Sequence, residues 1–137
     1  MRIISGFNKG KKLILPNDKT TRPLKDMAKE SIFNILSHAK YVNFHLKDSK
    51  VLDLFSGIGS FGLECISRGS KFVFFLENYP PVLEILKKII EIDILDKDGI
   101  IIIHRKKGDL DNYPKKFKVI DTKSYGLSTF VFGKKSN

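Results

Sequence analysis

Asp53 and the glycines that follow it form the stretch of this sequence whose spacing best suits ligand chemistry. The residues run Val51-Leu52-Asp53-Leu54-Phe55-Ser56-Gly57-Ile58-Gly59-Ser60-Phe61-Gly62. An apolar segment thus ends in a carboxylate and a G-x-G-x-x-G pattern follows. Glycines at this spacing allow a tight turn and close approach of the backbone to a ligand, and a helix that starts there offers free N–H groups. We interpret the stretch as the loop of a nucleotide-type cofactor site.

A second apolar run places an acid where a ribose-binding group belongs. Glu77 follows the run 72–76, about 20 residues after Gly57, where a β-α-β unit holds the ribose hydroxyls of a cofactor. The alternative is a structural strand-turn-helix with an incidental acid. The spacing also leaves open whether the cofactor is a nicotinamide dinucleotide or S-adenosylmethionine. We expect the aromatic residues of this run to lie in the core: Phe72, Phe74 and Phe75.

Two elements are predicted before the glycine loop. Residues 6–12 join two short apolar stretches and predict a hairpin with a basic tip. From Leu24 to Leu36 the apolar residues recur with helical periodicity, and Lys29 falls on an outward face of that helix.

Further elements are predicted after Glu77, and strands alternate with helices throughout. Pro80-Pro81 begins a helix, and residues 100–103 form a β-branched run suited to a buried strand. Residues 116–120 and 128–132 predict two last strands. The fold class is therefore α/β.

Length and composition restrict the kind of protein. At 137 residues, of which 42% are hydrophobic and 29% charged, the chain fits one soluble domain without a separate substrate domain. No apolar run approaches the roughly 18 residues of a membrane helix. The single cysteine, Cys65, excludes an intrachain disulfide, and the isolated His38, His45 and His104 indicate no metal site. We expect a cytoplasmic monomer that binds neither membrane nor metal.

Basic residues gather at the two ends of the chain. Residues 1–50 carry eleven Lys/Arg against four Asp/Glu, residues 51–96 four against seven, and residues 97–137 ten against four. Basic ends suit a polyanion held outside, and an acidic middle suits a small cationic cofactor. A generally lysine-rich surface without a ligand is the alternative, but the clustering favours nucleic acid.

Six ordered groups of residues carry a family resemblance. They are Arg2-Ile3-Ile4-x-Gly6, Lys9-Gly10-Lys11-Lys12-Leu13, Thr21-Arg22-Pro23, Lys29-Glu30-x-Ile32-Phe33-Asn34-Ile35-Leu36, Asp53-Leu54-Phe55-Ser56-Gly57-Ile58-Gly59 and Gly62-Leu63-Glu64-x-x-Ser67-Arg68-Gly69. The sequence resembles the RsmD family, which methylates N2 of a guanine in 16S ribosomal RNA with S-adenosylmethionine. The resemblance covers about residues 1–77 and resumes from about residue 90.

The resemblance implies a Rossmann-like class I methyltransferase fold with S-adenosylmethionine as cofactor. It implies that Asp53, Ser56, Gly57 and Gly59 surround the methionine part of the cofactor and that Glu77 holds its ribose. For Glu64 we favour a buried helix carboxylate bonded to nearby backbone over a catalytic role.

The resemblance also implies an RNA-binding face and a division of the chain. The partner is 16S rRNA or the small ribosomal subunit. Residues 1–49 are expected to form an RNA-binding hairpin and helix, and residues 50–137 a shortened methyltransferase core, within one compact domain. The residues that meet RNA are Arg2, Lys9, Lys11, Lys12 and Arg22.

The sequence departs from the family at the catalytic loop. Family members carry Asp/Asn-Pro-Pro-Tyr/Phe after the fourth strand, which aims the guanine amine at the methyl group and stacks the base. Chemistry on a base edge needs such a pocket. Here only Asn78-Tyr79-Pro80-Pro81 has the same letters, in another order, and we interpret it as the proline start of a helix. The catalytic residues are therefore unassigned.

The missing loop predicts a shortened sheet. If strands 3 and 4 are absent, the family order 3-2-1-4-5-7-6 becomes 2-1-5-7-6. Residues 100–103 would then pair with residues 51–54, with helix 81–95 as the crossover. The leading interpretation is an rRNA methyltransferase of the RsmD type that lacks its catalytic loop. The alternatives are a non-catalytic RNA- or ribosome-binding protein and the defective product of an internally deleted gene.

Overall fold

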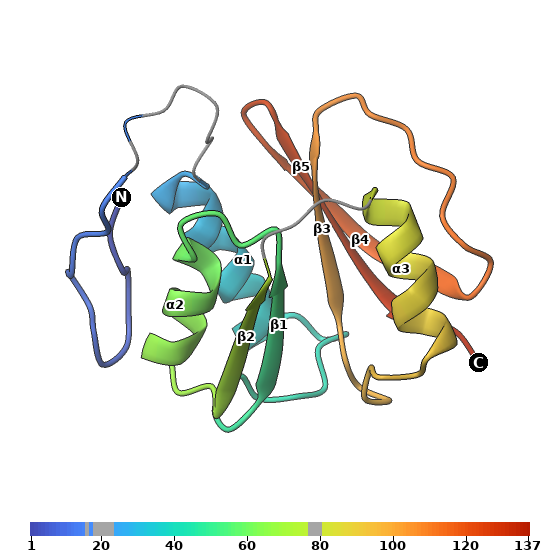
Figure 1. Ribbon diagram of the computed structural model, residues 1–137, viewed down its shortest axis with the longest axis horizontal. Coiled ribbons are helices and arrows are strands. Elements are labelled where there is room, and N and C mark those ends of the chain that lie inside the picture. Colours follow the sequence, from blue (N-terminus) through green and yellow to red (C-terminus); the bar gives the residue numbers. More distant parts are fainter. Residues whose placement is uncertain (16, 18–23, 77–80) are drawn as a thin grey trace. The chain divides into compact units, whose positions relative to one another are not determined.

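The computed structural model describes residues 1–15, 17, 24–76 and 81–137. In chain order the elements are α1 (Asp26–His38), β1 (Lys50–Leu54), α2 (Ser60–Ser67), β2 (Phe72–Leu76), α3 (Val82–Glu91), β3 (Ile101–Lys106), β4 (Phe117–Tyr125) and β5 (Ser128–Lys135) (Figure 1). The predicted α/β class is confirmed. No helix in the described ranges is long and apolar enough to cross a membrane.

The chain divides into two compact units. Unit 1 comprises residues 1–39 and 45–79, and unit 2 comprises residues 40–44 and 80–137. These units do not coincide with the expected division at residues 49 and 50, because the N-terminal hairpin and the glycine loop lie in the same unit.

Unit 1 contains a β-α-β unit built around the glycine pattern. Strands β1 and β2 are parallel, with Leu52 opposite Phe74 and Leu54 opposite Leu76, and α2 packs against both strands (Figure 1). Gly62 permits this close packing, since a Cβ there would come within 2.4 Å of the Phe75 ring. Helix α1 joins unit 1 through the rings of Phe33 and Phe61, whose centroids are 4.9 Å apart.

The expectation that the phenylalanines of β2 are core residues is wrong. Phe72, Phe74 and Phe75 retain 50%, 60% and 43% of their surface. The physical reason is the width of the sheet, because two strands offer too little surface to enclose large side chains between layers.

Unit 2 is an antiparallel sheet with the strand order β3-β5-β4, covered on one face by α3 (Figure 1). The last two strands were predicted, and α3 begins just after Pro81, as the proline pair indicated. The apolar core of the unit consists of Leu86, Ile90, Ile103, Phe117 and Val131.

The described strands form two sheets and not the single shortened sheet that was predicted. The pairs β2-β1 and β3-β5-β4 correspond to the predicted orders 2-1 and 5-7-6. The predicted pairing of residues 100–103 with residues 51–54 is not seen, since β1 and β3 belong to separate sheets. Strand β3 instead runs antiparallel to β5, and α3 places its apolar side chains in the core of that sheet.

Candidate functional site

The glycine loop is a tight connection between β1 and α2. Strand β1 ends at Leu54 and α2 begins at Ser60, and three residues between them have positive φ angles: Phe55, Gly57 and Gly59. The Gly59 N–H donates to the Ser56 carbonyl at 2.7 Å, and the Ser56 N–H donates to the Leu76 carbonyl at 3.1 Å. The loop is thereby fastened to the end of β2, which is where a β-α-β unit binds a cofactor.

Asp53 holds the beginning of α2. Its Oδ2 accepts the N–H of Gly62 at 3.0 Å, which satisfies one of the donors that a helix leaves unpaired in its first turn. Gly59 occupies the N-cap position of α2 and has no side chain that could accept a hydrogen bond there. The carboxylate therefore fixes the direction in which the loop leaves the strand.

Gly57 is less crowded than Gly59. It is exposed, and a Cβ placed on it would meet no atom of the described residues within 4 Å, whereas a Cβ on Gly59 would contact the Phe75 ring at 3.1 Å. Among the described residues, an added side chain thus has more room at Gly57 than at Gly59.

The predicted cofactor residues lie together as far as the structure describes them. Asp53, Ser56, Gly57 and Gly59 belong to the end of β1 and the following loop. Glu77 lies outside the described residues.

The predicted basic hairpin is present as a short antiparallel turn. Arg2 bridges Lys12, and the Ile3 N–H donates to the Lys11 carbonyl at 2.9 Å. The basic side chains point to solvent, with Lys9, Lys11 and Lys12 exposed and the Arg2 side chain 67% exposed beside Asp26. Arg22 lies outside the described residues.

Glu64 is a buried structural carboxylate, as predicted, and its partners come from the hairpin. Its two oxygens accept the N–H groups of Ile4 at 2.8 Å and Ser5 at 2.9 Å, and Oε1 also accepts the Arg68 guanidinium at 2.8 Å. The Lys29 ammonium stands 3.6 Å from the other oxygen, and the side chains of Lys29 and Glu64 are both fully buried.

The expectation that Lys29 faces outward is wrong. Its ammonium donates to the Arg2 carbonyl at 2.8 Å and to the Ser60 hydroxyl at 3.1 Å. The sequence analysis missed this residue because a lysine on a helix is normally exposed to solvent. Its neighbours along the helix could have indicated its burial, since Ala28, Ile32 and Phe33 are themselves buried.

Cys65 lies beside this charged cluster and is buried. It is 1% exposed, and burial, reinforced by the charges of Asp53 and Glu64, raises the pKa of its thiol to about 12. A thiol with this pKa is not a nucleophile at neutral pH.

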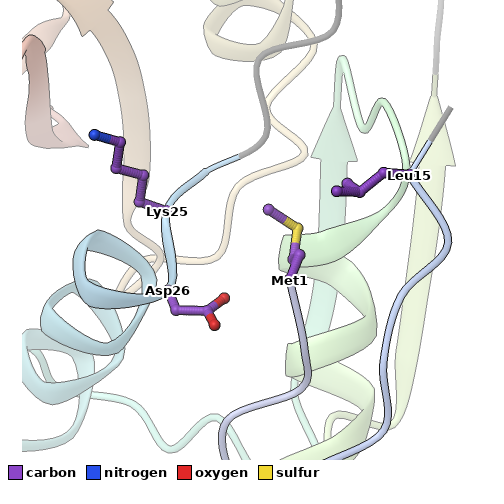
Figure 2. A pocket seen from close by; sticks show the side chains of 4 residues that line it. All are labelled: Met1, Leu15, Lys25 and Asp26. Atoms are coloured by element: carbon purple, nitrogen blue, oxygen red, sulfur yellow. The ribbon is translucent and has the colours of Figure 1, made fainter. Parts of the chain in front are cut away.

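A pocket of about 280 Å³ lies elsewhere in unit 1. It is lined by Met1, Leu15, Lys25 and Asp26 (Figure 2), so it involves the start of α1 and not the glycine loop. Among the residues that the structure describes, no group of His, Cys, Asp and Glu is arranged to hold a metal ion.

Comparison with known proteins identifies the family. The family described as Conserved hypothetical protein 95, the RsmD family, matches residues 1–92. The chain belongs to this family. The match includes the hairpin, α1, the glycine loop and α2, which are the elements that carried the resemblance in the sequence.

Relatives at the sequence level are named as rRNA methyltransferases. Ribosomal RNA small subunit methyltransferase D of Haemophilus influenzae is 41% identical over 88 residues, or 64% of this chain and 42% of the relative. Putative rRNA methyltransferase YlbH of Bacillus subtilis is 38% identical over 78 residues, or 57% of this chain and 39% of the relative. The matched segment thus spans less than half of the length of these curated relatives.

Two solved structures whose titles describe a putative methyltransferase and a putative methylase have a similar fold. The putative methyltransferase yhhF from Escherichia coli superposes with a TM-score of 0.78 at 18% identity, over 99% of this chain and 98% of the other. A putative methylase from Haemophilus influenzae gives a TM-score of 0.59 at 21% identity, with the same coverage.

Proposed function

We propose that this chain is an S-adenosylmethionine-dependent methyltransferase of small-subunit ribosomal RNA, with N2 of a guanine as the methyl acceptor. The observation that carries the proposal is the glycine loop, which lies within the family match and is fastened to the end of β2 by the hydrogen bond from the Ser56 N–H to the Leu76 carbonyl. When bound, S-adenosylmethionine supplies an electrophilic methyl group on a sulfonium sulfur.

Different residues of unit 1 would contact different parts of the cofactor or support the loop that binds it. Asp53 keeps the loop in shape through its hydrogen bond to Gly62. Ser56, Gly57 and Gly59 line the methionine end of the cofactor, and Glu77 holds its ribose, as the family resemblance implies.

The N-terminal hairpin supplies the contact with 16S rRNA or the small ribosomal subunit. Lys9, Lys11 and Lys12 are exposed and bear charges that neutralise phosphates, so we expect RNA affinity to fall steeply as salt rises from about 50 to 200 mM. Arg2 and Arg22 complete this set in the proposal.

A second candidate function is RNA or ribosome binding without catalysis. The observation that favours it is the missing Asp/Asn-Pro-Pro-Tyr/Phe sequence, since that loop would hold the guanine amine in place. This function uses the same hairpin and predicts RNA binding without methyl transfer.

The cofactor site is tested by Gly57→Val with Gly126→Val as the matched control. Both glycines have similar positive φ angles, 54° and 57°, and an added Cβ on either would meet no atom within 4 Å in the part of the chain that the structure describes, but Gly126 lies in the β4–β5 turn of unit 2. We expect Gly57→Val to weaken S-adenosylmethionine binding at least tenfold by calorimetry and Gly126→Val to leave it unchanged. Equal affinity of Gly57→Val and the unchanged protein would refute the proposed site.

Transfer of labelled methyl groups to unmodified small ribosomal subunits separates the two functions. Transfer above background, abolished by Gly57→Val, supports the methyltransferase. Salt-sensitive RNA binding without transfer supports the non-catalytic alternative.

A further inference from the structure

Helix α2 is joined at its two ends to different parts of the proposed function. Its beginning continues the glycine loop, where Asp53 accepts the Gly62 N–H. Its buried face and last turn hold the N-terminal hairpin, through Glu64 and Ser67. A contact that fixes the hairpin on α2 therefore also fixes the basic side chains relative to the loop.

Glu64 makes the central contacts of this junction. It accepts two backbone N–H groups of the hairpin, from Ile4 and Ser5, and it is fully buried beside Lys29. Lys29 extends the junction, since its ammonium donates to the Arg2 carbonyl on the hairpin and to the Ser60 hydroxyl on α2. A buried pair of this kind is weak evidence for stability, but its satisfied hydrogen bonds define one arrangement of the chain.

The last turn of α2 adds a second set of contacts. The Ser67 hydroxyl donates to the Ser5 carbonyl at 2.6 Å and accepts the Asn8 N–H at 2.9 Å, and the Phe7 N–H donates to the Ser67 carbonyl at 2.7 Å. Gly6 lies so close that a Cβ on it would be 1.9 Å from that carbonyl oxygen.

We propose that Glu64, supported by Lys29, is a positioning residue that holds the RNA-binding hairpin in register with the cofactor loop. The inference rests on the proposed function and extends it to selectivity. The hairpin keeps its lysines whether or not it is docked, so a free hairpin still attracts any polyanion. Only the docked hairpin presents those charges in one fixed pattern, and recognition of a particular RNA shape depends on such pre-organisation.

The primary experiment compares Glu64→Gln with the unchanged protein for binding to two RNAs. The probes are unmodified small ribosomal subunits and an unrelated structured RNA at equal phosphate concentration. We expect Glu64→Gln to weaken binding to the small subunit about tenfold and to leave binding to the unrelated RNA within twofold, with the same salt dependence. Amide hydrogen exchange at Ile4 and Ser5 should accelerate, because an amide NH₂ replaces one of the two accepting oxygens.

Gly6→Ala undocks the hairpin without changing a charge, and Gly10→Ala is its matched control. Both glycines have positive φ angles, 80° and 86°, but a Cβ on Gly10 has no atom within 4 Å. Gly6→Ala should reproduce the loss of selectivity and Gly10→Ala should not. Lys29→Met/Glu64→Leu, which removes both buried charges, should melt cooperatively and still lack selectivity.

The outcomes separate this inference from the proposed function. If the unchanged protein prefers the small subunit and Glu64→Gln and Gly6→Ala bind it equally well, the positioning role is overturned and the proposed function stands. If the unchanged protein shows no preference for the small subunit, the proposed substrate is wrong and the positioning role falls with it. Lys9→Ala/Lys11→Ala serves as the contrast. Loss of two positive charges should weaken binding to both RNAs and reduce the salt dependence of that binding.

Discussion

In unit 1 two opposite charges, those of Lys29 and Glu64, are both fully buried, whereas the ion pairs of unit 2 keep part of their surface in water. The Arg105 and Asp111 side chains, for example, are 25% and 11% exposed. Unit 2 is instead organised around apolar side chains that α3 contributes to a three-stranded sheet. We therefore expect mutations of the buried charges in unit 1 and of the apolar core in unit 2 to differ in their effects.

The largest effect is expected in unit 2 from Phe117→Ala. Phe117 is 6% exposed, and its ring occupies the space over Gly133, 2.1 Å from where a Cβ would stand. Its removal leaves a cavity and should lower the free energy of unfolding by about 4 kcal/mol. Hydrogen exchange of the β3 and β5 amides measures the loss. If hydrogen exchange accelerated equally in β1 and α2, the distinction between the units would be contradicted, because both units would then unfold together.

Lys29→Met is expected to destabilise unit 1 by about 3 kcal/mol, because Glu64 then keeps only the partly exposed Arg68 as a cation. Lys29→Met/Glu64→Leu should recover only part of this loss, since it avoids the cost of desolvating two charges but leaves the Ile4 and Ser5 N–H groups without their acceptor. Thermal melts of the three proteins test the expectation. If the double variant is no more stable than Lys29→Met, the backbone hydrogen bonds of Glu64, and not the charge pair, dominate the stability of unit 1.

Arg105→Ala removes one partner of an ion pair that is partly exposed to solvent. The Arg105 guanidinium donates to both oxygens of Asp111, at 2.6 and 2.9 Å, and this hydrogen bonding raises the pKa of the arginine further above its ordinary value. Because solvent screens the pair, we expect a loss of only about 1 kcal/mol, reduced by salt. A loss as large as that of Lys29→Met would contradict the distinction between the units.

The smallest effect concerns the pH dependence of unit 2. The His104 ring stacks on Phe130 with centroids 4.6 Å apart, and although the residue is exposed at the surface, partial desolvation of the ring lowers its pKa from the ordinary value of 6.5. A lowered pKa means that the unfolded chain binds the proton more readily, so the stability that neutral His104 provides is present above pH 6.5 and decreases as pH falls below it. Melting curves between about pH 7.5 and 5 should show this decrease, and His104→Phe should reduce it. An unchanged pH dependence in His104→Phe would assign the effect to other groups.

The sequence by itself determined the elements that depend on neighbours along the chain. The glycine loop was predictable because Gly57 and Gly59 adopt positive φ angles that side chains disfavour. The helix after Pro81 and the strands around the 125–126 turn followed from local periodicity and turn chemistry. A buried Glu64 bonded to nearby backbone was also predicted, in preference to a catalytic role.

The tertiary structure decided which distant residues meet. The burial of Lys29 depends on a carbonyl 27 residues away and a hydroxyl 31 residues away, and neither is visible in a helical pattern. The assignment of β1 and β3 to different sheets, and the exposure of Phe72, Phe74 and Phe75, depend on how many strands join a sheet. Local periodicity shows that a side chain belongs to a strand, but the neighbours that cover that strand are set by the whole fold.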